Sequence, residues 1–257
     1  MLKRLAQKVF GPRALADIAR DRAAERRSAV AWAAGGCCFV ALGGLVVLLS
    51  LLAPPRRLHA FTSLSCRLIL RALGVRVTVR GREYLHSGRT YLFVGNHVNL
   101  FDVFVLYGYI PIFFRGVELD EHFDWFFYGR IIRRLGMIPI SQTSGRAALR
   151  SLKVAQAALA QGTSVLILPE GGRTPDGRFQ PFKKGAFLLA QRTDAAVVPV
   201  VMTGAFAILQ RGGRIIRPGA MELRLGAPIP RGRLTGLDAT AIAERVRRQM
   251  AELFSQA

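Results

Sequence analysis

The pattern of apolar and polar positions divides the chain into a long uncharged run near its start and a body of shorter alternating segments. No charged residue occurs between Ser28 and Pro55, whereas the preceding residues 1–27 are rich in lysine and arginine. About 25 of the uncharged residues would form a helix of about 38 Å, enough to cross the hydrocarbon core of a bilayer. Because the charged leader is long and the run exceeds a typical signal-peptide core, we expect this segment to be retained.

A second apolar segment, residues 58–73, follows Pro54-Pro55 and has the pattern of an amphipathic helix. Basic residues flank both ends of the uncharged run, so the positive-inside rule favours neither orientation of a single span. A hairpin or tilted insertion that turns at the prolines would leave both ends on the cytoplasmic face. Gly35-Gly36 and Gly43-Gly44 would then let the second helix pack closely. The alternative is a plain single-span anchor.

After Gly74 the pattern changes to short β-branched runs separated by helical stretches. Residues 75–80 alternate apolar and polar side chains, as a half-buried strand does, and residues 164–168 form the apolar run of a buried strand. This alternation of strands and helices predicts an α/β domain with a largely parallel sheet. Further strands are expected at residues 90–95, 110–115, 196–203 and 222–225, and helices at residues 124–135, 145–161 (with Ser144 as N-cap) and 240–254.

These patterns predict three parts along the chain. A basic N-terminal segment covers residues 1–27, membrane-associated helices cover residues 28–73, and an α/β domain covers residues 74–257. The expected fold is therefore α/β, with a mostly parallel mixed sheet and flanking helices. An N-terminal membrane-binding helical segment precedes it, with a two-helix motif as one arrangement.

The composition favours a membrane surface as the partner of this chain. Hydrophobic residues make up 51%, mean hydropathy is +0.27, and the formal net charge is +21. Such a charge indicates either nucleic acid or an anionic lipid surface as partner. A nucleic-acid-binding protein would have no use for the long uncharged run, so we expect no nucleic acid and favour membrane phospholipids.

The cysteines and histidines give no metal-ligand spacing and no disulfide framework. Two of the three cysteines lie inside the uncharged run, where we expect them to pack as small buried hydrophobic residues. We therefore expect neither a structural nor a catalytic metal. The residues concerned are Cys37, Cys38, Cys66, His59, His86, His97 and His122.

The first group of candidate catalytic residues follows the apolar run at residues 91–94. Gly95 is followed by Asn96 and His97, and Asp102 comes five residues after the histidine. A histidine whose ring is oriented by a nearby carboxylate can act as a general base near neutral pH. The alternative is a histidine that only ends a strand and an aspartate that caps the next helix.

A second polar stretch, Pro169-Glu170-Gly171-Gly172-Arg173-Thr174, follows another predicted strand, and Pro181-Phe182-Lys183-Lys184-Gly185 comes after it. Glycines let backbone N–H groups approach an oxyanion closely. Arg173 can grip a phosphate with its planar fork, and Lys183 and Lys184 add point charges. The alternative is a glycine-rich surface turn with solvated lysines. A Walker A loop is excluded, because no Gly-Lys-Ser/Thr follows at the required spacing.

Together the two stretches resemble the glycerolipid acyltransferase family typified by 1-acylglycerol-3-phosphate acyltransferase. Asn96-His97 through Asp102 matches the family's Asn-His-x4-Asp motif, and residues 169–174 approximate its Pro-Glu-Gly-Thr-Arg-Ser block. Val197-Val198-Pro199-Val200 and Phe182-Lys183-Lys184-Gly185-Ala186 are also similar to family blocks. The resemblance covers about residues 75–226.

The sequence departs from the family in two places. Gly172 stands where the family usually has threonine, and Thr174 stands where serine is usual. The family's second motif normally ends in an arginine that helps to bind the acceptor phosphate, and residues 136–142 lack it. Either Arg146 or Arg133 substitutes for that arginine, or the acceptor is not a simple glycerol phosphate.

The resemblance implies acyl transfer from a thioester, acyl-CoA or acyl-carrier protein, to the hydroxyl of a lysophospholipid, most directly 1-acylglycerol-3-phosphate. It implies a catalytic domain on the cytoplasmic face of the cytoplasmic membrane, and no cofactor beyond the acyl donor. Acyl-carrier protein is then a candidate partner, alongside the lysophospholipid acceptor. Alternatives are another lyso-lipid acceptor, such as a lyso-ornithine lipid, and a membrane-tethered inactive interaction protein. The implied catalytic residues are His97 and Asp102, and the implied substrate-binding residues are Asn96, Glu170, Gly171, Gly172, Arg173, Lys183 and Lys184.

Overall fold

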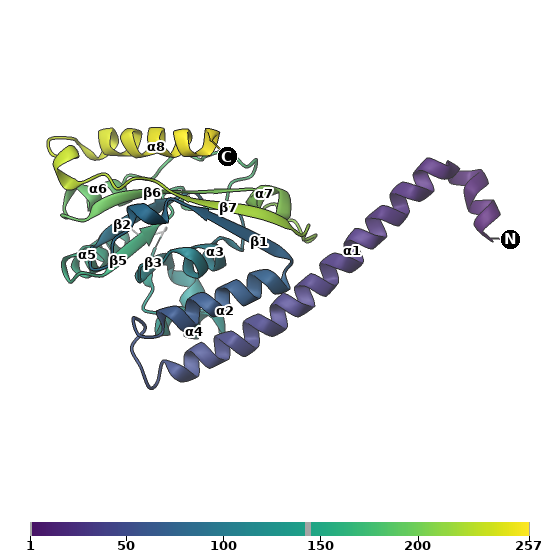
Figure 1. The fold of residues 1–257 in the computed structure, drawn as a ribbon, viewed down its shortest axis with the longest axis horizontal. Coiled ribbons are helices and arrows are strands. Elements are labelled where there is room, and N and C mark those ends of the chain that lie inside the picture. Colours follow the sequence, from purple (N-terminus) through teal and green to yellow (C-terminus); the bar gives the residue numbers. More distant parts are fainter. Residues whose placement is uncertain (1, 142–144, 257) are drawn as a thin grey trace.

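The protein begins with a helical hairpin that leads into an α/β body. The computed structural model describes residues 2–141 and 145–256, with side chains for residues 22–141, 145 and 147–256. Helix α1 (Leu2–Leu49) is joined by a turn containing Pro54-Pro55 to helix α2 (His59–Ala72), and the two helices pack side by side (Figure 1). The N-terminal part of α1 projects beyond the α/β body.

The body is built on one seven-stranded sheet with the strand order β1-β7-β6-β2-β5-β3-β4. Neighbouring strands are parallel except for β6 and β7, which are antiparallel. Strands β2 and β5 are therefore adjacent and parallel, and their carboxyl ends meet at the same edge. The strands are β1 (Val75–Arg80), β2 (Tyr91–Gly95), β3 (Phe114–Leu119), β4 (Ile138–Ile140), β5 (Ser164–Ile167), β6 (Ala196–Thr203) and β7 (Gly219–Leu225).

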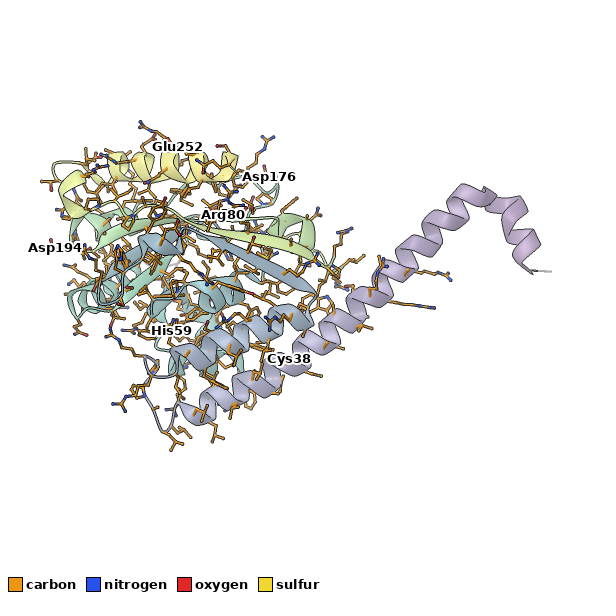
Figure 2. All side chains as sticks on the ribbon, viewed as in Figure 1. Cys38, His59, Arg80, Asp176, Asp194 and Glu252 are labelled. Carbon is orange, nitrogen blue, oxygen red and sulfur yellow. The ribbon has the colours of Figure 1, made fainter. Side chains whose placement is uncertain are left out.

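Helices cover both faces of the sheet, as Figure 1 shows. One apolar cluster packs α1 to α4 and α7 against one face, and a second packs α5, α6 and α8 against the other. Side chains fill the space between the layers (Figure 2). The helices not yet given are α3 (Asp102–Tyr109), α4 (Tyr128–Arg134), α5 (Gly145–Ala160), α6 (Gly185–Gln191), α7 (Ala205–Ile208) and α8 (Ala239–Ser255), with short 3-10 turns η1 (Arg82–Tyr84), η2 (Asp120–Asp124) and η3 (Arg231–Arg233).

The local sequence explains the elements that frame the site. All five residues of β2 are buried, which a strand covered by helices on both faces requires. Helix α8 begins where the Asp238 side chain accepts a hydrogen bond from the Ala241 N–H at 2.7 Å. Its buried residues Ile242, Val246 and Met250 recur every four positions and face the sheet.

The predicted α/β class with a mostly parallel sheet is confirmed, and α1 is the expected long apolar helix. The strand expected at residues 110–115 is misplaced. Ile110 caps the end of α3, and β3 begins only at Phe114. Helix α1 is continuous across the boundary predicted at residue 27. Gln142 of the second motif and Ser144, the expected N-cap of α5, lie outside the described residues.

The glycine pairs of α1 play different parts from those expected. A Cβ on Gly35 would collide with the Leu73 side chain, so this glycine does permit close packing at the end of α2. A Cβ on Gly43 would instead meet Ile131 of α4. Gly36 and Gly44 have open space around them. Only one of the four glycines therefore serves the contact with α2, because the other close approach is made to α4.

Candidate active site

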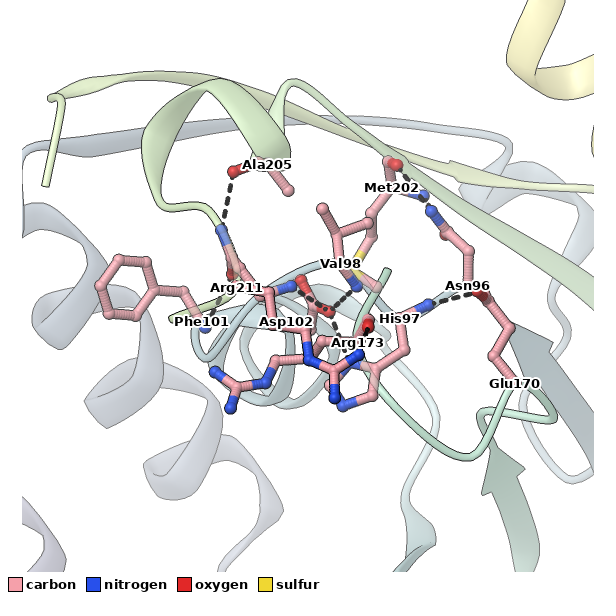
Figure 3. Close-up of polar contacts among 11 residues, drawn as sticks. Asn96, His97, Val98, Phe101, Asp102, Glu170, Arg173, Met202, Ala205 and Arg211 are labelled. Atoms are coloured by element: carbon pink, nitrogen blue, oxygen red, sulfur yellow. Dashed lines mark hydrogen bonds and ion pairs between the residues drawn. The ribbon is translucent and has the colours of Figure 1, made fainter. Parts of the chain in front are cut away.

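A histidine and an aspartate meet at the carboxyl end of β2 (Figure 3). The strand ends at Gly95, and His97 Nδ1 lies 2.8 Å from Asp102 Oδ2. The same oxygen accepts the backbone N–H groups of Val98 at 2.5 Å and Asn99 at 3.0 Å. The carboxylate thus holds the ring by Nδ1, which leaves Nε2 as the nitrogen that can accept a proton.

Asp102 is held rigidly at the start of α3. It is fully buried and forms the first residue of α3, where backbone N–H groups and the helix dipole favour a negative charge. Its second oxygen, Oδ1, is buried and has no partner among the described residues, so Oδ2 alone fixes the carboxylate. The His97 side chain is 28% exposed, which leaves its ring accessible to a substrate.

Two buried asparagines hold the loop that carries His97. The Asn96 amide donates to the Met202 carbonyl at 3.0 Å and accepts the Met202 N–H at 2.8 Å, which ties the loop to β6. Asn99 donates to the Ala205 carbonyl and accepts the Phe101 N–H, both at 2.8 Å. Asn96 was expected to bind substrate, but both ends of its buried amide are bonded to backbone. In the structure Asn96 fastens the loop of His97 to β6, and its contact with substrate stays a prediction.

Glu170 plays a similar part from the turn that follows the neighbouring strand β5. One carboxylate oxygen accepts the His97 N–H and the other accepts the Gln180 N–H, both at 2.9 Å. Burial raises the pKa of Glu170, and the two backbone hydrogen bonds oppose that shift. The Thr174 N–H also donates to the His97 carbonyl, at 2.9 Å. The Glu170 carboxylate therefore holds the loop of His97 in place, and its contact with substrate stays a prediction.

The remaining candidates for substrate binding surround the same loop. Gly171 has φ +67°, a left-handed conformation that favours glycine, and a Cβ there would collide with the Lys183 side chain. Arg173 is half-buried, and Figure 3 draws its side chain beside His97. Gly172 is exposed with open space around it, and Lys184 is exposed at the start of α6. The structure thus brings Arg173 and Lys183 to this loop and leaves Lys184 at a helix end.

One arginine at the site lies outside both sequence motifs and was therefore not predicted. Arg211, in the loop after α7, donates through Nη1 to the Arg173 carbonyl at 3.3 Å. Of the two arginines proposed to replace the missing family arginine, Arg133 pairs with Asp124 at 3.2 Å, next to α4. The side chain of Arg146 lies outside the described residues. Arg211 was missed because β6 and α7 separate it from both motifs in the sequence.

An apolar cavity of about 50 Å³ lies between α1, α2, α3 and α4. Val103 and Phe104, which directly follow Asp102, form part of its wall, together with Phe39, Cys66 and Met137. Its lining would suit a hydrocarbon chain. No three His, Cys, Asp or Glu side chains in the described part of the chain come together as metal ligands, and the absence of a metal stays a prediction.

Comparisons with known proteins agree with this arrangement. A family model named Acyltransferase matches residues 76–203. 1-acyl-sn-glycerol-3-phosphate acyltransferase alpha of Homo sapiens is 31% identical over 184 residues, which are 71% of this chain and 65% of that protein. The 1-acyl-sn-glycerol-3-phosphate acyltransferase of Cocos nucifera is 29% identical over 164 residues, 63% of this chain and 53% of that protein. The chain thus spans about half to two thirds of the length of these relatives.

The fold also matches a solved structure. The crystal structure of the 1-acyl-sn-glycerophosphate (LPA) acyltransferase PlsC from Thermotoga maritima superimposes with a TM-score of 0.75. The match covers 91% of this chain and 98% of that one, at 22% sequence identity. Because the match extends over nearly the whole of both chains, it includes the helical hairpin as well as the sheet.

Proposed function

We propose that the chain, a member of the Acyltransferase family by its match over residues 76–203, transfers a fatty acyl group from a thioester to a lysophospholipid hydroxyl. The acceptor we propose is 1-acylglycerol-3-phosphate, which gives phosphatidic acid. The observation that carries the proposal is the contact of 2.8 Å between His97 and the buried Asp102 at the carboxyl end of β2. In α/β sheets ligands gather at such strand ends.

The proposed reaction uses the hydroxyl of the acceptor as nucleophile. His97 Nε2 takes the hydroxyl proton while the oxygen attacks the thioester carbonyl, and a tetrahedral intermediate forms. The intermediate collapses, the carbon–sulfur bond breaks, and the thiolate leaves with the proton returned by the imidazolium. General-base assistance of this kind contributes about 10²- to 10⁴-fold to the rate. Asp102 would fix the ring tautomer and stabilise the imidazolium.

The fixed loop supports this mechanism, because a general base is effective only when its geometry is maintained. Asn96 and Glu170 hold the backbone on either side of the His97 ring by four hydrogen bonds to or from backbone groups. The apolar cavity that Val103 and Phe104 help to line, directly after Asp102 in the sequence, is the proposed place for part of an acyl chain.

The helical hairpin supports action at a membrane. Residues Arg22–Leu49 of α1 are long and apolar enough to cross a bilayer, by length and composition. Large apolar side chains are exposed along the hairpin and near α4, which fits membrane association. We propose that the α/β body docks on the cytoplasmic face and meets its lipid acceptor there. The exposed side chains are Val30, Val40, Leu45, Leu48, Leu51, Leu52, Leu64, Leu68, Trp125 and Phe126.

The proposal includes two classes of thioester donor and a second class of acceptor. The thioester donor is acyl-CoA or acyl-carrier protein, and the net charge of +21 would favour an acidic carrier protein as well as anionic lipid. The acceptor could instead be another lyso-lipid, such as a lyso-ornithine lipid, because residues 136–142 lack the arginine of the family's second motif. The intact pair of His97 and Asp102 argues against an inactive, tethered interaction protein.

A transfer assay tests the proposal directly. Membranes containing the full chain are given a labelled acyl donor, as acyl-CoA or acyl-carrier protein, and a panel of lyso-lipids. We expect labelled phosphatidic acid from 1-acylglycerol-3-phosphate, above the level of membranes without the protein. Product from a different lyso-lipid alone would change the acceptor and keep the reaction. No transfer to any acceptor by folded protein would contradict the proposed function.

A further inference from the structure

We propose that Arg211 supplies a second guanidinium for the acceptor phosphate, in the place of the arginine that the second motif lacks. The inference rests on the proposed function and names the group that would select a phosphate-bearing acceptor. Arg211 lies far from both sequence motifs, in the loop between α7 and β7. The structure nevertheless brings it to the segment that carries Arg173.

A short series of contacts connects Arg211 to the catalytic histidine. Arg211 Nη1 donates to the Arg173 carbonyl at 3.3 Å. The next residue, Thr174, donates its N–H to the His97 carbonyl at 2.9 Å. Figure 3 shows Arg173 and Arg211 on the side of the loop where the His97 ring lies. Two guanidinium groups are therefore present at the catalytic loop, from two separate segments of the chain.

Among the side chains that the structure describes, no carboxylate forms an ion pair with Arg173 or Arg211. Two like charges repel each other, and an anion placed between them relieves that repulsion. Guanidinium groups match a phosphate in shape and can bind it through paired hydrogen bonds. A phosphomonoester with nearly two negative charges is the best-matched ligand.

The loop that carries Arg211 is also fastened to the membrane helix. The Arg214 carbonyl accepts hydrogen bonds from the Ser28 hydroxyl at 3.2 Å and from the Trp32 indole N–H at 2.8 Å. The Ile216 N–H in turn donates to the Ser28 hydroxyl at 2.8 Å. The loop thus bridges α1 and the catalytic segment. A lipid that enters beside α1 would present its headgroup to Arg211.

Other arginines are less well placed for this role. Arg133 is held by Asp124 and by the Phe123 carbonyl, at the start of the segment that leads into α4. Arg217 shares the loop with Arg211 and is exposed, and its backbone N–H donates to the Ile208 carbonyl at 2.9 Å. Arg217 therefore offers a matched control that removes the same charge from the same loop.

The test compares Arg211→Gln and Arg211→Lys with Arg217→Gln in neutral mixed micelles, where kcat and KM are measured for acceptor and donor separately. Loss of charge-assisted hydrogen bonds to phosphate should raise the KM for 1-acylglycerol-3-phosphate roughly 10- to 100-fold in Arg211→Gln. The KM for the acyl donor should stay unchanged, Arg211→Lys should recover part of the loss, and Arg217→Gln should stay within about twofold of the wild type. Thermal unfolding of each variant checks that it is folded.

Equal acceptor KM values for Arg211→Gln, Arg217→Gln and the wild type would overturn the inference about Arg211. Transfer by the wild type in the same assay would still support the proposed function. If the wild type transfers to no acceptor, the proposed function fails separately. Binding of labelled 1-acylglycerol-3-phosphate to the wild type and Arg211→Gln in the same micelles then decides the inference. Weaker binding to Arg211→Gln by 10-fold or more supports it, and equal binding overturns it.

Discussion

Asp102 holds His97 and two backbone N–H groups through a single carboxylate oxygen. Its role can be foreseen from the sequence, because both residues lie on one short segment and their spacing permits contact. The roles of Asn96 and Glu170, which hold the loop of His97 in place, could not be foreseen in this way. Asn96 bonds to a residue 106 positions away, and Glu170 to one 73 positions away. Such partners depend on which strands are adjacent, so the sequence suggested substrate binding for two side chains that position the loop.

Replacing Asp102 with asparagine should lower kcat by about 10²- to 10⁴-fold. The amide can still accept hydrogen bonds, but it removes the negative charge that stabilises the imidazolium and controls the tautomer of His97. Steady-state transfer assays on the purified variant measure this effect. Asp194→Asn, a change at an exposed aspartate, is the control and should retain full activity. A kcat within a factor of three of the wild type for Asp102→Asn would contradict the assigned role.

Glu170 should make stability depend on pH in a specific direction. Burial raises its pKa above the ordinary value of 4.5, so the folded state keeps the proton where the unfolded chain has released it. The free energy of unfolding should therefore fall as pH rises from about 4.5 towards the raised pKa. Urea unfolding at several pH values should show this slope in the wild type and a flatter slope in Glu170→Gln. The same slope in both proteins would show that Glu170 does not titrate in this way.

Strands and helices with a clear periodicity of apolar and polar residues could be predicted from the sequence. Those without such a periodicity could not. The strands at Val75–Arg80 and Ala196–Thr203 match the expected ranges, because β-branched runs in an alternating or wholly apolar pattern specify strands. Helix α3 was missed, since its sequence is apolar on all sides and resembles a strand. Strand β4 has only three residues, too few for a period to be visible.

The helical hairpin should bind membranes through its turn as well as through α1. Leu51 and Leu52 are 58% and 83% exposed at that turn, where they have no protein core to enter. Replacing both with aspartate should reduce the fraction of protein that floats with lipid vesicles, because charged groups are costly in the bilayer interior. Val154, 43% exposed on α5, belongs to a helix that packs on the opposite face of the sheet.

Val154→Asp is the matched control for the change at the turn and should float like the wild type. If the double variant at Leu51 and Leu52 also floats like the wild type, the turn does not enter the membrane. The anchor would then reside in α1 alone, which is the plain single-span arrangement.

At the scale of the whole molecule, the arrangement of parts explains the unusual composition. The hairpin places apolar surface on one side of the sheet, and the catalytic loop lies at the edge where the loop of Arg211 meets α1. The net charge of +21 adds attraction to an anionic surface, about 1 kcal/mol for each basic residue near it. Mean hydropathy and charge could indicate a membrane partner from the sequence. They could not indicate that the loop of Arg211 would lie between α1 and the segment of Arg173.

The proposed role of His97 as the general base of an acyl transfer can be tested by comparing the wild type with His97→Ala. The purified wild type and His97→Ala are given the same acyl donor and acceptor at saturating concentrations, and kcat is measured for each. We predict a fall of at least about 10²-fold for His97→Ala, with unchanged unfolding temperature. His122→Ala, a change at a histidine held by Glu118 at 2.8 Å, is the control. Transfer by folded His97→Ala at the wild-type rate would show that His97 is not the general base.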